Sequence, residues 1–202
     1  DHYFIDASID SSLNNKRAEI YRMDKRDKVI IDSAIVKNGK LTFKGKVDII
    51  DAYVISIDSV KGHLPIILEN TNFKIKLNKD SLNISKILGS KQNEITYIYK
   101  KQSKNLRKEF NKLNIRAKNP LVNRVEILKI QKSYDSLRKI ATNFDIKFIK
   151  KHNDKAFSVF TLERLVFNRQ ISDDIAKELY DNLTLEMQNL KSSKAILEAI
   201  NK

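Results

Sequence analysis

The chain has 202 residues, of which 41% are hydrophobic and 32% are charged, and its formal net charge is +14 at pH 7. Its apolar runs are short and interrupted by charge, so the sequence predicts no transmembrane helix. The absence of cysteine excludes zinc–thiolate sites, iron–sulfur sites, disulfides and thiol nucleophiles within this chain. Asp1 begins directly in a strand-like pattern rather than in a signal peptide, as expected of a mature or trimmed form.

The first ninety residues show the two-residue period of β-strands, with short polar turns between the strands. Besides the central hairpin described next, strands are predicted over residues 2–9, 17–23, 52–57, 64–68, 73–77 and 82–87. Pro65 is expected at a strand start or on a sheet edge, where a missing donor is harmless. Many short strands at close spacing are typical of an antiparallel sandwich or barrel.

Residues 31–47 are predicted to form one β-hairpin around the turn sequence KNGK at residues 37–40. Asn-Gly is the strongest short-range hairpin signal, because a type I′ turn needs positive φ at both central residues. Glycine adopts such angles freely and asparagine tolerates them. After the turn, Leu41 and Phe43 alternate with polar residues, so one face of that strand is expected to be buried.

Near Gly89 the period changes to that of α-helices. Apolar positions from Ile95 to Leu113 predict one long helix, and Asn119-Pro120 is expected to cap and start a second. The second helix runs to about His152, and the two form an antiparallel hairpin. Further helices are predicted over residues 155–167, from the cap Ser172 through Met187, and from a cap at Ser192 or Ser193 through Ile200.

The predicted fold class is therefore α+β with segregated parts. Residues 1–90 are expected to form an antiparallel β-sandwich or barrel. Residues 91–202 are expected to form an all-α domain, a long helical hairpin followed by a bundle of shorter helices.

Positive charge is concentrated in the second part: residues 96–202 contain 23 Lys and Arg against 12 Asp and Glu, whereas residues 1–95 contain 16 against 13. One interpretation is a surface that binds phosphates or another anionic surface. The other, which we favour, is the solvated face of a lysine-rich helical hairpin. Tyr134, Phe144 and Phe148 lie on the apolar stripe and not among the lysines, so nucleic acid is not an expected partner.

The sequence contains no pattern that predicts catalysis. His2, His63 and His152 are far apart and are expected at the surface. There is no G-x-S-x-G, no H-E-x-x-H and no glycine-rich phosphate loop. We therefore predict no catalytic residue, no cofactor-binding residue and no metal ligand. The residues selected for contact with a partner protein are Tyr53, Tyr97 and Tyr99.

Several segments of the chain together resemble the DUF4369 family. Residues 31–45, IDSAIVKNGKLTFKG, are similar to the family pattern D-S-a-x-V-x-x-G-x-F-x-F-x-G, and AYVISI at 52–57 to its next strand. PIILEN at 65–70 and LGSKQN at 88–93 are similar to its "f-f-l-E-n-g" and "v-x-G-S-x-x-N" segments. The resemblance covers about residues 1–95. FIKKHNDKAF at 148–157 and NLKSSK at 189–194 are similar to the helical segment that follows this domain in such proteins.

The resemblance implies a context rather than a reaction. Such proteins are typically exported, often as lipoproteins, in Bacteroidetes, and a thioredoxin-like domain of the thiol-disulfide reductase type commonly follows. The chain is then expected to be a non-catalytic accessory region in the periplasm or cell envelope, with its redox domain outside these 202 residues and a lipid anchor upstream. Its expected partner is that thioredoxin-like domain or another protein, with homodimerisation as an alternative.

Two other functions stay open from the sequence alone. The lysine-rich helices suggest a basic module that binds nucleic acid or an anionic surface. The strand-rich part suggests a sandwich that binds a small ligand or a glycan.

Overall fold

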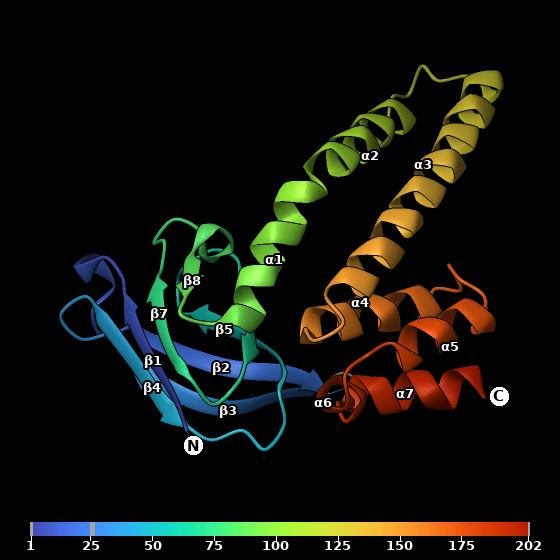
Figure 1. Ribbon diagram of the computed structural model, residues 1–202. Coiled ribbons are helices and arrows are strands. Elements are labelled where there is room, and N and C mark those ends of the chain that lie inside the picture. Colours follow the sequence, from blue (N-terminus) through green and yellow to red (C-terminus); the bar gives the residue numbers. More distant parts are fainter. Residues whose placement is uncertain (1, 25–26, 202) are drawn as a thin grey trace. The chain divides into compact units, whose positions relative to one another are not determined.

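The computed structural model describes residues 2–24 and 27–201, and the chain divides into two compact units (Figure 1). The first unit ends at Ile95 and the second begins at Thr96, so the division falls within helix α1 (Lys91–Gln102). The sequence placed the boundary five residues earlier, before this helix. All the strands precede all the α-helices, so the predicted α+β class with segregated parts is confirmed.

The first unit contains two separate four-stranded sheets, which are not closed into a barrel. One sheet has the strand order β4 (Lys40–Gly45), β1 (Tyr3–Ser8), β7 (Asn72–Lys76) and β8 (Lys86–Leu88). The other has the order β3 (Asp27–Ile35), β2 (Arg17–Asp24), β5 (Asp51–Ile57) and β6 (Leu64–Leu68). The pairing is antiparallel except between β1 and β7.

One apolar core joins the two sheets. Alternate residues of β1, β4, β5 and β7 point into it, as the buried–exposed patterns of these strands show. Its largest fully buried side chains include Phe43 and Phe73 from one sheet and Ile20 and Ile55 from the other. Burying each such side chain stabilises the fold by about 1.5–3 kcal/mol. Pro65 lies on β6, an edge strand, as predicted.

The predicted hairpin over residues 31–47 is wrong, although its turn forms. Asn38 and Gly39 have φ values of 51° and 68°, and the Lys37 and Lys40 backbones exchange two hydrogen bonds of 2.9 Å. The flanking strands then separate, because β3 pairs with β2 whereas β4 pairs with β1 in the other sheet. The turn therefore carries the chain from one sheet to the other.

A second crossing lies beside this turn and holds it. The connection from β1 to β2 contains a 3₁₀ turn at Ser11–Leu13 and also passes between the sheets. Its Ile9 N–H donates to the Gly39 carbonyl at 2.9 Å, and Asn14 Oδ1 accepts from the Gly39 N–H at 3.0 Å. Val36, fully buried, bonds through its backbone to Asn15 and Lys16. The two crossings are thus one hydrogen-bonded structure.

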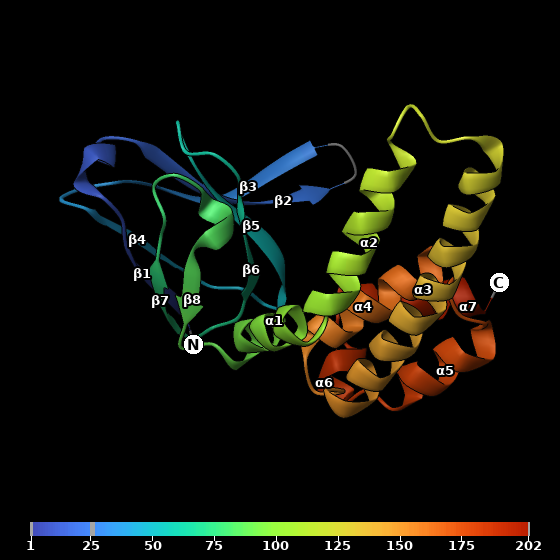
Figure 2. The same cartoon turned by 90° about the horizontal axis from the view of Figure 1, so that it is seen from above.

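The second unit contains a helical hairpin in which α2 (Lys104–Ala117) and α3 (Arg124–Lys151) run side by side (Figures 1 and 2). The single helix predicted from Ile95 to Leu113 is divided at Ser103, whose hydroxyl donates to the Tyr99 carbonyl at 2.7 Å. A hydroxyl that bonds to the preceding turn competes with the helical pattern and bends it.

The helix cap predicted at Asn119 is wrong. The cap of α3 is Asn123, whose side chain accepts from the Glu126 N–H at 2.9 Å. Asn119 and the following proline belong instead to the loop between the helices, where Asn119 Oδ1 accepts from the Leu121 N–H. Both asparagines suit a cap chemically, and only the one beside the first helical turn can serve as one.

Four shorter helices complete the second unit: α4 (Ala156–Phe167), α5 (Asp173–Asp181), α6 (Leu185–Gln188) and α7 (Lys191–Ile200). Ser172 caps α5 as predicted, but the helix ends at Asp181 and the predicted continuation through Met187 forms the separate α6. Neither Ser192 nor Ser193 caps the last helix, which starts after Leu190. Ser193 is buried, and its hydroxyl donates to the Met187 carbonyl.

Candidate functional site

Three polar residues near the end of the first unit form one hydrogen-bonded cluster. The Asn93 side chain accepts from the Ile67 N–H at 2.9 Å and donates to the Ile67 carbonyl at 2.6 Å. Its amide also donates to Ser90 Oγ at 2.8 Å, and the Ser90 hydroxyl donates to Glu69 Oε1 at 2.6 Å. The cluster fastens the first turn of α1 to β6. Glu69, Ser90 and Asn93 all lie in segments that resemble the family pattern. Their hydrogen bonds connect the start of α1 to the backbone of β6 and to the residue that follows this strand.

Other residues of the same pattern also have structural partners. Asn70 accepts from the Val47 N–H at 3.0 Å and donates to the Val47 carbonyl at 2.7 Å, which repeats the geometry of Asn93 and Ile67. Asp32 accepts from the Tyr3 hydroxyl at 3.2 Å. Burial, and then the Asp32 carboxylate, raises the pKa of Tyr3 well above its ordinary value. These residues of the family pattern therefore stabilise the folded first unit through hydrogen bonds.

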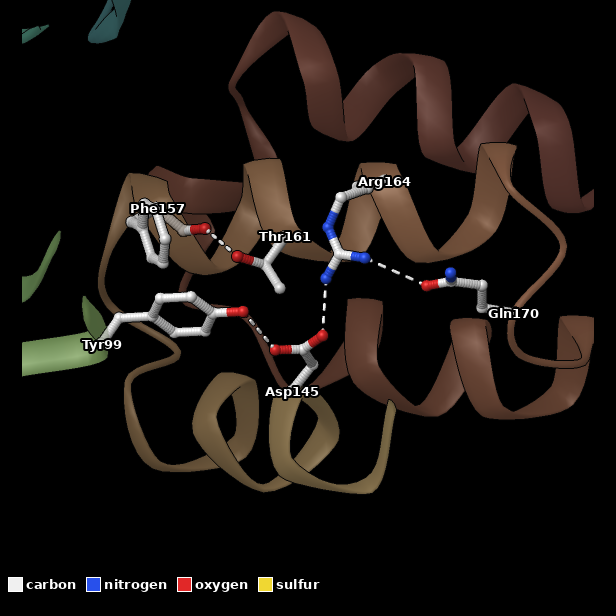
Figure 3. A network of polar contacts seen from close by, with 6 residues as sticks. All are labelled: Tyr99, Asp145, Phe157, Thr161, Arg164 and Gln170. Carbon is white, nitrogen blue, oxygen red and sulfur yellow. Dashed lines mark hydrogen bonds and ion pairs between the residues drawn. The ribbon is translucent and has the colours of Figure 1, made fainter. Parts of the chain in front are cut away.

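The second unit contains a buried polar network around Asp145, which is 4% exposed (Figure 3). The Tyr99 hydroxyl donates to Asp145 Oδ1 at 2.7 Å, and Arg164 Nη2 lies 2.6 Å from Asp145 Oδ2. Arg164 also donates to Gln170 Oε1 at 3.0 Å. A buried carboxylate needs such partners, because removing one partner leaves a buried charge uncompensated. Such a loss lowers the stability of a protein by about 3–5 kcal/mol. The network joins α1, α3 and α4.

Aromatic rings surround the Tyr99 end of this network. The Tyr99 ring lies 4.9–5.4 Å, centroid to centroid, from Phe144, Phe148 and Phe157. Burial, followed by the hydrogen bond to Asp145, raises the pKa of Tyr99 well above its ordinary value. The phenol is therefore held in its neutral form, in which it can donate.

The three tyrosines selected from the sequence thus occupy three different environments. Tyr53 is 8% exposed and packs in the core between the sheets, where burial raises its pKa. Tyr99 belongs to the Asp145 network. Tyr97 is half-buried, with Lys100 Nζ 5.8 Å from the centre of its ring. Tyr53 thus belongs to the first unit and the other two to the second, and little of Tyr53 is left at the surface for a partner to contact.

The histidines are also separate. His2 and His63 are exposed, as expected, and His63 Nδ1 lies 3.4 Å from the Tyr21 hydroxyl. His152, expected at the surface, is half-buried at the end of α3, with its ring 4.5 Å from that of Phe148. Its Nε2 is buried and has no hydrogen-bond partner among the described residues, and burial lowers its pKa.

A cleft of about 940 Å³ lies beside α3 in the second unit. Arg138, Lys139 and Ile146 line it from α3, and the connection from α4 to α5 lines it with Arg169 and Ile171. A smaller cavity of about 290 Å³ shares Arg138, Thr142 and Gln170 with the cleft and reaches Tyr99 and Asp145. The lining of the cleft contains three cationic side chains and no carboxylate.

Asp145, Arg164 and Asn93 organise the structure but were not among the residues predicted from the sequence. Asp145 carried a usable signal: it follows Phe144 on the helix stripe that ends at Phe148, and an acid beside an apolar stripe must find a partner. The family pattern contained Asn93, but nothing in the sequence shows that its side chain bonds to β6.

No group of three or more His, Asp or Glu side chains among residues 2–24 and 27–201 is placed to hold a metal ion. None of the described helices has the length and apolar character needed to cross a bilayer.

Comparison with known proteins gives a match over the first unit. Residues 3–96 match the family model described as Domain of unknown function (DUF4369). No curated protein and no solved structure matches the chain. The matched residues include both sheets and the cluster of Glu69, Ser90 and Asn93 that ties α1 to β6. The match to the DUF4369 family model thus spans nearly the whole first unit and agrees with the resemblance of the sequence segments.

Proposed function

We propose that this chain is an accessory region that docks another polypeptide and has no catalytic residue of its own. The setting is the one that the DUF4369 resemblance implies, an exported thiol-disulfide oxidoreductase-type protein of the cell envelope. Its thioredoxin-like domain lies outside these 202 residues. Since the chain has no cysteine, thiol chemistry belongs to that domain.

The observation that carries this proposal is the exposed apolar surface of β3. Val29, Ile30, Ile31 and Ile35 are between 36% and 44% exposed, on a strand that pairs only with β2 among the described strands. The register shifts between Ile20 and Tyr21, which leaves Ile31 without an opposite residue on β2. Exposed apolar residues on an edge strand are a template for binding another chain.

The opposite edge of the same sheet is protected. β6 is only five residues long, contains Pro65 and has both backbone groups of Ile67 bonded to Asn93. Such features block pairing with another strand. The contrast between the two edges directs a partner to β3.

The test begins with the gene beyond Lys202. Where it encodes a C-x-x-C domain, the full-length protein is compared with the variant Ile30→Glu/Ile31→Glu by hydrogen exchange and by insulin reduction. We expect the variant to lose exchange protection of β3 amides while its reductase rate stays within about twofold. Ile84→Glu, at a more exposed apolar site of the same unit, is the control and should change neither the exchange of β3 amides nor the reductase rate.

A reading frame without a C-x-x-C domain, and without one in a neighbouring gene, would remove the redox setting. Equal β3 exchange in the full-length protein and in the double variant would remove the docking surface.

A second candidate function, binding to an anionic membrane surface, is favoured by the end of the helical hairpin. Ile115, Leu121, Val125 and Leu128 are 55–88% exposed there. Lys118, Arg124 and Lys129 lie among them and form no ion pair within the described residues. Exposed apolar side chains with unpaired cations suit the interface of an anionic bilayer.

Co-sedimentation with vesicles containing phosphatidylglycerol tests this second function. Binding should fall steeply between 50 and 200 mM salt, and Leu121→Asp should weaken it more than Leu185→Asp, a substitution at an exposed leucine outside the hairpin. Equal binding to neutral vesicles, or none at low salt, would remove it.

A further inference from the structure

We propose that the cleft between α3 and the α4–α5 connection binds a small amphipathic anion, a carboxylate or phosphate that carries an apolar chain. Arg138, Lys139 and Arg169 would hold the anionic group, and Ile146, Ile171 and Ile175 would contact the apolar part. The proposal concerns a different surface from β3 and from the hairpin end, and it stands or falls independently of the docking role.

The charges of the cleft are available to a ligand. Lys139 and Arg169 form no ion pair or side-chain hydrogen bond within the described part of the chain. Arg138 has only a distant partner, with Nη1 4.0 Å from Asp135 Oδ1, near the limit for an ion pair. By contrast, Arg164 in the neighbouring cavity is already bonded to Asp145 and Gln170. Three cations without a neutralising carboxylate create a positive potential inside a concave site.

Arg169 provides a second, independent observation. It follows α4 with φ of 52°, a left-handed conformation that glycine normally supplies after a helix. Its N–H donates to the Val166 carbonyl at 2.9 Å, and the next residue, Gln170, donates to Leu165 at 2.8 Å, so the turn is a regular helix ending. A side chain kept where glycine would be less strained suggests a role for that side chain.

The apolar residues define the rest of the ligand. Ile146 and Ile171 are partly buried and Ile175 is 37% exposed, so the cleft offers an apolar wall beside its cations. A volume of about 940 Å³ falls in the range of small-molecule sites. The first turn of α5 already carries Asp173 and Asp174, which complement the helix dipole, so the anion is held by side chains rather than by that helix end.

Isothermal titration of the whole chain tests the proposal, with octyl phosphate and octanoate as probes below their micelle-forming concentrations. We expect saturable binding of both, at least tenfold weaker binding of inorganic phosphate, and none of octyltrimethylammonium. Failure of both octyl anions to bind would overturn the proposal, as would equal binding of inorganic phosphate or of the cationic probe.

Arg169→Gly is the decisive variant, because it removes the guanidinium while relieving the left-handed backbone. It should melt at the same or a higher temperature and bind octyl phosphate about tenfold more weakly. Lys194→Gln removes one positive charge from α7, outside the cleft lining, and should bind like the unaltered chain. An equal loss in both variants would show only general attraction to a basic protein and would overturn the proposal.

Discussion

Asn93 forms with Ile67 the pair of hydrogen bonds that a neighbouring strand would form: its side-chain oxygen accepts from the Ile67 N–H, and its amide donates to the Ile67 carbonyl. Asn93 is 2% exposed and Ile67 is 5% exposed, so water cannot replace these bonds. The asparagine thereby completes the edge of β6 and anchors the helix that leaves the sandwich.

Replacing Asn93 with alanine should destabilise the first unit by about 2–4 kcal/mol. Two buried backbone groups would lose their partners, and each unsatisfied buried group costs about 1–3 kcal/mol. Urea unfolding followed by far-UV circular dichroism measures the change. Asn105→Ala, at an exposed position of α2, is the control and should stay within about 0.5 kcal/mol. An equal effect of the two substitutions would contradict the role of Asn93.

Gly39→Ala should destabilise the crossing between the sheets by more than about 1 kcal/mol. The φ of Gly39 is 68°, and an added Cβ would lie 2.9 Å from the Ile9 carbonyl oxygen, which is closer than van der Waals contact allows. Asn38→Gly, at the adjacent position with φ of 51°, should be neutral or stabilising. Thermal unfolding of both variants provides the comparison, and a neutral Gly39→Ala would show that the turn relaxes.

Stability should fall at alkaline pH because of Tyr99. Its folded-state pKa is raised, so its contribution is complete below the ordinary tyrosine value of 10.0 and declines as the pH rises above it. Tyr99→Phe should lower stability near pH 7 by about 1–3 kcal/mol, through loss of the bond to Asp145, and should flatten the alkaline decline.

Urea midpoints at pH 8 and pH 11 measure this effect of Tyr99. Tyr180→Phe is the control, since the Tyr180 hydroxyl makes no hydrogen bond among the described residues. A decline of unchanged steepness in Tyr99→Phe would assign the alkaline sensitivity elsewhere, for example to Tyr3, whose pKa is raised as well.

His152 should make the second unit sensitive to mild acid. Burial first, and then Lys151, lowers its folded-state pKa below the ordinary value of 6.5. Its contribution is therefore complete above that value and is lost as the pH falls through the folded-state pKa, because only the unfolded chain binds the proton freely. His152→Gln should reduce the difference between urea midpoints measured at pH 7.5 and pH 5.5. NMR titration of the ring protons checks the direction directly, and a pKa above 6.5 would contradict it.

The sequence predicted which residues lie in strands and helices better than which strands pair. Alternation of Leu41 and Phe43 shows that β4 buries one face, but it does not say whether β1 or β3 lies beside it. The turn at Asn38 and Gly39 was also predicted correctly, but a turn alone does not determine whether the two strands beside it pair. Pairing depends on long-range contacts, here those of Val36 with residues 15 and 16, which a local pattern does not contain.

The organising residues of the second unit were predictable only in part. The sequence predicted the apolar stripe of α3 that contains Tyr134, Phe144 and Phe148, and it predicted the cap of α5 at Ser172. The contact between Tyr99 and Asp145 joins residues 46 positions apart, and the cleft around Arg169 depends on where a helix ends. Neither has a periodic signal.

The two neighbouring crossings have a consequence for how the first unit forms. Because β1 and β4 belong to one sheet while β2 and β3, which lie between them along the chain, belong to the other, neither sheet can be completed from a continuous segment. Formation of each sheet therefore requires strands that are separated in sequence by strands of the other sheet, which gives the unit a high contact order. We expect it to fold slowly and in one cooperative step, without an intermediate in which only one sheet has formed.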